Sequence, residues 1–261
     1  MRRRSLVVVA AVCAVAAGAV VVTLVVQSPG HPGRTGTQSS GSSVTTGTPP
    51  RQTATGADAS EGDASTLVAT LSATVPKYAS PGGAPTGTVP GSWFGAPSAL
   101  PVLAQDNGYL QVRLAQRPNG STAWIAASAA TLSTTSYRIV VDLSTEHLML
   151  YKLGHLVLSA PAGIGTVQDP TPTGNFFVAL YAAPPSASWG PFIMVTSGHS
   201  DAISDWEKSG DAIVAIHGPL GADAAIGTTG ARVSHGCVRL HDAALVELRQ
   251  VPVGSPVQIE G

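Results

Sequence analysis

The amino-acid sequence predicts a mainly β protein with an apolar core. Of its 261 residues, 29 are Gly and 20 are Pro, and these favour turns and short extended segments over a bundle of long helices. Apolar residues make up 44% of the chain, which is enough to bury a core and excludes disorder throughout. Only 11% of the residues are charged and the net charge is -1, so the chain carries too little positive charge to bind nucleic acid.

Residues 1–26 are predicted to form a basic cytoplasmic tip and a transmembrane helix. Three arginines at positions 2–4 precede an apolar run over residues 6–26, which as a helix would be about 32 Å long and would cross a hydrocarbon layer about 30 Å thick. The positive-inside rule keeps the arginines in the cytoplasm, so we expect a single-pass protein of the cell membrane whose remaining chain lies outside, at the cell wall. The alternative is a cleaved signal peptide and a secreted protein, for which residues 25–27 offer a poor cleavage site.

Residues 27–66 are predicted to be a disordered linker. Ser, Thr, Gly and Pro dominate this segment, and no periodic apolar pattern is present that could offset the entropy of ordering a core. A flexible coil of this length has a typical end-to-end distance of about 35 Å, so it could hold a domain away from the membrane.

Residues 67–135 are predicted to form a small antiparallel β-barrel-like domain. Short apolar segments alternate with turn sequences at residues 106–108 and 117–120, and residues 109–114 alternate with the period of two that is typical of a half-buried strand. The order of these segments resembles the bacterial Src-homology-3-like modules of wall proteins. Two roles stay open: a spacer for the next domain, or a module that binds glycan or peptide.

Residues 136–261 are predicted to form a second β domain. Extended runs over residues 137–142, 147–151 and 156–158 are typical of consecutive hairpin strands. One short helix is expected over residues 242–250, with Asp242 as its N-cap. Further extended runs are expected over residues 175–181, 212–217 and 252–259.

The residues best suited to chemistry lie in the segment Ser-His-Gly-Cys-Val-Arg at positions 234–239. A free cysteine has a pKa of about 8.5, so a thiolate nucleophile needs a nearby base or cation at neutral pH. Two histidines are candidates: His235 in the segment itself, and His217 at the end of an apolar strand. Gly236 would let backbone amides approach a bound carbonyl, as an oxyanion site requires. The pattern predicts acyl transfer by Cys237.

This pattern resembles the L,D-transpeptidase catalytic domains of bacterial cell-wall enzymes, in which a histidine is followed at short spacing by Ser/Thr-His-Gly-Cys-x-Asn/Arg. Here 16 residues separate His217 from Ser234. The resemblance extends from Tyr137 to Ile259 and implies a β-sandwich of the L,D-transpeptidase type. Other segments that resemble family segments are residues 163–165, 171–176, 190–192 and 216–218.

The resemblance also implies a reaction and its partners. Cys237 would attack the carbonyl of the third residue in a peptidoglycan tetrapeptide stem, release the terminal D-alanine and form a thioester. An amine of a neighbouring stem would then accept the acyl group, which gives a 3-3 cross-link. His217 would be the general base, with the Gly218 backbone orienting its ring. Carbapenems are implied as covalent inhibitors, and no metal or other cofactor is required.

Supporting roles follow from the same resemblance. The amides around His235, Gly236 and Cys237, next to Ser234, would hold the oxyanion. Arg239 stands where some family members carry Asn, and we expect it to support the site by contact with a stem carboxylate.

Three alternatives to this interpretation remain. A sortase-like cysteine transpeptidase would need an arginine well beyond Cys237, where only Arg249 follows Arg239. A non-catalytic wall-binding protein would not need the cysteine. A zinc site could be built from a mixed set of nitrogen and sulfur ligands, namely His217, His235, Cys237 and His241.

Several further residues near this segment are expected to be structural. His199 and His241 are interpreted as ordinary surface or core residues. Trp189 and Trp206 are interpreted as packing residues that flank a mobile loop over residues 190–210.

Overall fold

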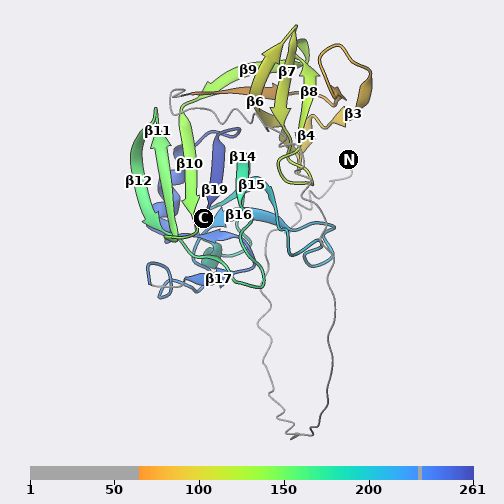
Figure 1. Cartoon of the computed structure of the whole chain (residues 1–261). Helices are drawn as coiled ribbons and strands as arrows, with labels where there is room; N and C mark the ends of the chain where they lie inside the picture. The colour runs from red at the N-terminus through yellow and green to blue at the C-terminus, as the bar shows by residue number, and fades with distance from the viewer. Residues whose placement is uncertain (1–64, 229–230) are drawn as a thin grey trace, which may run out of the picture. The chain divides into compact units, whose positions relative to one another are not determined.

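The computed structural model describes residues 65–228 and 231–261, which are coloured in Figure 1. The predicted transmembrane helix over residues 6–26 and most of the predicted linker lie outside the described residues. Within the described ranges, no helix is both long enough and apolar enough to cross a membrane. The described chain is mainly β, as the composition predicts, with a single α-helix among these residues.

Seven strands from the first part of the described chain form one antiparallel sheet, in the spatial order β3-β2-β8-β7-β6-β1-β9. The alternation predicted for residues 109–114 is confirmed, because Leu110 and Val112 of β7 are buried while their neighbours are only partly covered. The Src-homology-3-like identity of this sheet stays a prediction. Its strands are β1 (Thr66–Leu71), β2 (Val75–Tyr78), β3 (Pro85–Val89), β6 (Ala99–Asp106), β7 (Tyr109–Arg113), β8 (Thr122–Ala126) and β9 (Ala130–Thr135), and β4 (Ser92–Trp93) and β5 (Ala96–Pro97) form a separate hairpin.

Eight strands from the second part form a mixed sheet, in the order β12-β11-β10-β19-β14-β15-β16-β18 (Figure 1). The predicted hairpin strands are confirmed, because β11 pairs antiparallel with both β10 and β12. The strands are β10 (Tyr137–Asp142), β11 (His147–Lys152), β12 (His155–Pro161), β14 (Gly174–Ala182), β15 (Ile193–His199), β16 (Ile213–His217), β18 (Val238–Arg239) and β19 (Pro256–Glu260), while β13 (Ile164–Gly165) and β17 (Arg232–Ser234) form a separate parallel pair.

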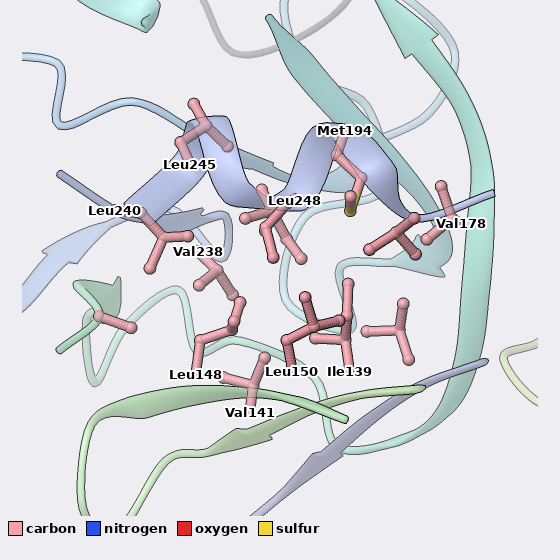
Figure 2. Close-up of a cluster of buried hydrophobic side chains, with 14 of the residues drawn as sticks. Ile139, Val141, Leu148, Leu150, Val178, Met194, Val238, Leu240, Leu245 and Leu248 are labelled. Carbon is pink, nitrogen blue, oxygen red and sulfur yellow. The ribbon is translucent and has the colours of Figure 1, made fainter. Parts of the chain in front are cut away.

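The core of this second sheet lies between its two halves. Ile139 and Leu148 from β10 and β11 belong to the same buried cluster as Val178 from β14 and Met194 from β15. Figure 2 shows the side chains of β10 and β11 directed toward Leu248, beside the helix. Two parts of the sheet therefore pack on one shared core, which is the arrangement expected of a sandwich-like domain.

The predicted helix over residues 242–250 forms as α1 (Asp242–Glu247), followed by the 3-10 turn η3 (Leu248–Gln250). The predicted N-cap is wrong by one residue. His241 is the N-cap, with extended backbone angles, and no side chain caps the helix. Asp242 already lies in the first helical turn, where a negative charge is favoured by the helix dipole.

The expectation of a mobile loop over residues 190–210 is also corrected. Residues 193–199 form strand β15, all of whose residues are buried, so the loop within this range begins after His199. Trp189 is a buried packing residue, as expected, in the 3-10 turn η2 (Ala187–Trp189).

The two large sheets share interior contacts. Phe177 and Ala179 of β14 belong to the buried cluster that fills the first sheet. A buried hydrogen bond of 2.7 Å joins the hydroxyls of Thr135 and Ser255. Gly254 lies so close to the first sheet that a Cβ there would be 2.5 Å from Cγ1 of Val68, which leaves no room for a side chain.

Candidate active site

Cys237 and His217 are brought together by parallel pairing of β16 and β18. In this pair Ile216 lies opposite Val238, and Cys237 directly precedes β18. Side chains alternate along a strand, and both Ile216 and Val238 point into the core of the second sheet. Cys237 and His217 therefore lie on the opposite face from that core. Cys237 belongs there to a second buried cluster, together with Ala215 of β16 and Trp189.

The ring of His217 is fixed in one orientation. It is fully buried, and its Nδ1 lies 2.8 Å from the carbonyl oxygen of Gly218. Since a carbonyl only accepts hydrogen bonds, the proton sits on Nδ1 and Nε2 carries the lone pair. Nε2 is buried and has no hydrogen-bond partner among the described residues. The face of the ring packs on Trp189, with 4.5 Å between ring centroids. The ring of His217 is thus held in one orientation with its Nε2 lone pair unused among the described residues.

Two glycines make this orientation possible. The Gly218 amide donates to the Trp189 carbonyl at 2.7 Å, and a Cβ at Gly218 would lie 2.6 Å from the amide nitrogen of Gly190. A Cβ at Gly190 would in turn lie 2.8 Å from Oδ1 of Asp242. The backbone at Gly190 and the backbone at Gly218 can approach each other this closely only because neither glycine has a side chain.

Ser234 shapes the turn that presents Cys237. Its hydroxyl donates to the Cys237 carbonyl at 2.5 Å and accepts from the Gly236 amide at 3.1 Å. Gly236 has φ +117°, a conformation that side chains disfavour. Because the Gly236 amide already donates to Ser234, the expected oxyanion donors narrow to the amides of His235 and Cys237.

Backbone hydrogen bonds join the segment that carries Cys237 to residues 163–166. Gly163 and Arg239 exchange two backbone hydrogen bonds of 2.7 and 2.8 Å, and the Thr166 amide donates to the Ser234 carbonyl at 2.9 Å. A Cβ at Gly163 would lie 2.7 Å from Cγ2 of Val233. Arg239 is buried in this arrangement. Its contact with a stem carboxylate stays a prediction.

His235 lies at the surface while the sulfur beside it is covered. The His235 side chain is 46% exposed, whereas Cys237 is 3% exposed. The His235 ring is 4.9 Å from the ring of Trp206, and its Nε2 is 3.8 Å from Oδ2 of Asp169. A small cavity, about 10 Å³ in volume, is bordered by His235, Trp206 and Cys237. Its lining consists of Ser200, Trp206, Ala212, Ile213, Val214, His235 and Cys237.

The side chains proposed for the alternative zinc site do not converge. His217 is fully buried against Trp189, whereas the side chains of His235 and His241 are 46% and 42% exposed. Over residues 65–228 and 231–261, no group of three or more His, Cys, Asp or Glu side chains could hold a metal ion.

His199 is a buried histidine whose surroundings were not predicted. Its Nδ1 lies 2.8 Å from Oδ2 of Asp211, although the two are not aligned for a hydrogen bond. Burial lowers the pKa of His199 below 6.5, and Arg117 adds to this effect while Asp211 opposes it. The pKa of Asp211 is raised by burial. Hydrogen bonds from Arg117 and the Ala212 amide lower it, as do the charges of His199 and Arg117, and together they hold the pKa of Asp211 below 3.8.

The lowered pKa of His199 predicts a loss of stability on mild acidification. The unfolded chain binds a proton at this residue more readily than the folded chain, so the stabilisation is complete above pH 6.5 and is lost as the pH falls toward the folded-state pKa. The free energy of unfolding would be measured in urea from pH 7 to pH 5. We expect it to fall less steeply with decreasing pH in His199→Gln than in the wild type, and the two slopes should differ by at most about 1.4 kcal/mol per pH unit. Asp211 would act only below its unfolded pKa near 3.8 and so lies outside this window. Equal slopes in both proteins would contradict the assignment.

Comparison with known proteins finds matches to the second part of the chain, which carries this site. Residues 136–259 match the sequence profile of the L,D-transpeptidase catalytic domain, YkuD. The YkuD proteins of Bacillus licheniformis and Bacillus subtilis are 29% and 28% identical over 127 residues, which is 48% of this chain and 67% of each relative. Residues 136–259 are therefore similar to the L,D-transpeptidase catalytic domain family.

Solved L,D-transpeptidase structures are similar to parts of this chain. The C442S mutant of the Enterococcus faecium enzyme is 25% identical and has a TM-score of 0.37, with 47% of this chain and 49% of that chain covered. The Mycobacterium smegmatis enzyme is 18% identical with a TM-score of 0.38, covering 62% and 82%. L,D-transpeptidase 3 of Mycobacterium tuberculosis with a faropenem-derived adduct is 16% identical with a TM-score of 0.37, covering 56% and 76%. This chain thus spans about half the length of the Enterococcus faecium chain.

Proposed function

We propose that this protein is a cell-wall L,D-transpeptidase whose nucleophile is Cys237. One observation carries the proposal: His217 and Cys237 occupy the same face of two paired strands, and the Gly218 carbonyl holds the His217 proton on Nδ1. The unprotonated Nε2 is thereby suited to take the proton of a thiol. The match of residues 136–259 to the L,D-transpeptidase catalytic domain family supports this reaction class.

In the first half-reaction, Nε2 of His217 accepts the thiol proton and the Cys237 sulfur attacks the carbonyl of the third residue of a tetrapeptide stem. The amides of His235 and Cys237 donate to the developing oxyanion. The bond to D-alanine then breaks, His217 returns its proton to the leaving amine, and a thioester remains on Cys237.

In the second half-reaction, an amine of a neighbouring stem attacks the thioester. His217 takes a proton from this amine and returns it to the sulfur as the thiol, which yields a 3-3 cross-link. Donor and acceptor stems are therefore the partners of the site. Carbapenems, which present a strained acyl group, would acylate the same sulfur. We expect the apolar run over residues 6–26 to anchor the protein in the membrane, with this chemistry outside the cytoplasm.

The proposal is tested by incubating the full chain with a disaccharide tetrapeptide and identifying the products by mass spectrometry. We expect free D-alanine, a transient adduct on Cys237 and a 3-3 dimer. A disaccharide tripeptide is the matched control, because it lacks the leaving D-alanine and should give no dimer by itself. Binding of the tetrapeptide with no D-alanine release would favour a non-catalytic wall-binding protein. Cleavage of a polypeptide sorting signal instead would favour a sortase.

A further inference from the structure

The loop between β15 and β16 forms one wall of the space around Cys237. Ser200, Trp206 and Ala212 from this loop line the small cavity that also contacts His235 and Cys237. The Trp206 ring lies 4.9 Å from the His235 ring. The position of residues 200–212 therefore determines what surrounds the sulfur.

Hydrogen bonds within the loop shape it, and one of 2.8 Å from the Ser200 amide to the Ala212 carbonyl joins its two ends. The Trp206 amide donates to the Asp211 carbonyl at 2.9 Å, and the Gly210 amide donates to Oδ1 of Asp205 at 2.7 Å. Its tip contains two consecutive residues with positive φ, Glu207 and Lys208. These bonds shape the loop, but they do not fix it to the residues on either side of Cys237.

Arg117, in the turn between β7 and β8 of the first sheet, binds both ends of this loop. Its Nη1 donates to the Ser200 carbonyl at 2.8 Å and its Nη2 donates to the Ile203 carbonyl at 2.9 Å. Its Nε donates to Oδ1 of Asp211 at 2.8 Å. All three nitrogens of the planar guanidinium are used, and an ammonium group could not reproduce this geometry.

Asn119, two residues further along the same turn, fixes the start of the loop. Its Nδ2 donates to the His199 carbonyl at 2.7 Å, and its Oδ1 accepts from the His199 amide at 2.9 Å. The side-chain amide therefore pairs with the backbone at the end of β15 as a neighbouring strand would. Nδ2 also lies 3.2 Å from Oδ1 of Asp201.

We propose that Arg117 and Asn119 are positioning residues for the active site: the first sheet holds the loop over residues 200–212, and through Trp206 it sets the wall beside His235 and Cys237. This inference builds on the proposed function, because it assigns the loop a part in acylation of Cys237. It gives the first sheet a role in catalysis that neither a spacer nor a ligand-binding module would have.

The loop's mobility is measured first, by hydrogen exchange of residues 200–212 in the full chain. We expect at least about tenfold faster exchange in Arg117→Ala and in Asn119→Asp, which keeps the acceptor oxygen but loses both Nδ2 bonds. Arg138→Ala is the matched control, since Arg138 is an exposed arginine of β10 that packs on Tyr151 and lies 3.4 Å from Gln258. Unchanged exchange in both test variants would overturn the proposal, and this readout does not require that the protein be a transpeptidase.

The effect on chemistry is measured as the second-order rate of Cys237 acylation by faropenem. We expect a fall of about tenfold in Arg117→Ala, with the melting temperature close to that of the wild type, because a displaced wall misplaces the bound acyl group. Arg117→Lys should restore less than half of the loss, since it keeps the charge beside Asp211 but cannot bind both loop carbonyls. A loosened loop with an unchanged acylation rate would overturn the catalytic part of the proposal. Absence of any adduct in the wild type would instead count against the proposed function.

Discussion

Cys237→Ala is expected to abolish acyl transfer and covalent adduct formation completely. The sulfur is the only thiol among the described residues, and it lies on the same face of the β16–β18 pair as His217. The substitution removes one buried atom from a cluster that already contains Ala215, so the free energy of unfolding should fall by no more than about 1 kcal/mol. Intact-mass measurements with faropenem or a tetrapeptide donor would show the loss directly.

The fold of Cys237→Ala can be checked separately from its activity. Circular dichroism and urea unfolding should match the wild type, which separates loss of the nucleophile from loss of the structure. Cys237→Ser offers a second comparison, because its hydroxyl is similar in shape but a much weaker nucleophile at neutral pH. Cross-linking activity retained by Cys237→Ala would disprove the mechanism proposed for this site.

His217→Asn is expected to lower kcat/KM by about 10²- to 10⁴-fold, the usual contribution of a general base. The asparagine amide can still donate to the Gly218 carbonyl, but no lone pair remains where Nε2 stood. Part of the rate should return as the pH rises toward 9 or 10, because a free thiol ionises with a pKa of about 8.5. The measurement is the rate of faropenem acylation from pH 6 to pH 10.

His235→Asn is the matched control for this experiment. His235 is also a histidine near Cys237, but its side chain is 46% exposed and faces Trp206. We expect a much smaller fall and an unaltered pH profile. The opposite result, with His235→Asn impaired and His217→Asn normal, would exchange the roles of the two histidines.

Local patterns in the sequence were sufficient to predict the positions of most of the strands. The alternation in β7 and the apolar runs of β10, β11 and β16 depend on neighbouring residues, and the structure has strands at these positions. The helix start was predicted less well, because Asp is favoured both as an N-cap and in the first turn. The backbone angles of His241 settle that choice and leave no trace in the sequence.

The candidate site was predictable only in part. The segment around Cys237 and the spacing of His217 resemble a known family, but their adjacency depends on the non-local pairing of β16 with β18. The hydrogen bond between Arg117 and Asp211 joins residues 94 positions apart. Such a contact has no period and no local motif, so no sequence pattern indicated that a turn in the first sheet would reach the loop beside the nucleophile.

The contribution of Phe177 and Ala179 to the interior of the first sheet has a consequence for how the enzyme can be divided. A fragment beginning at residue 136 would expose to solvent an apolar surface that is buried in the full chain. The remaining fragment would lack some of the side chains that form its core. The two halves should therefore melt in a single transition. A shortened version for inhibitor screening would need that surface redesigned before it stayed in solution.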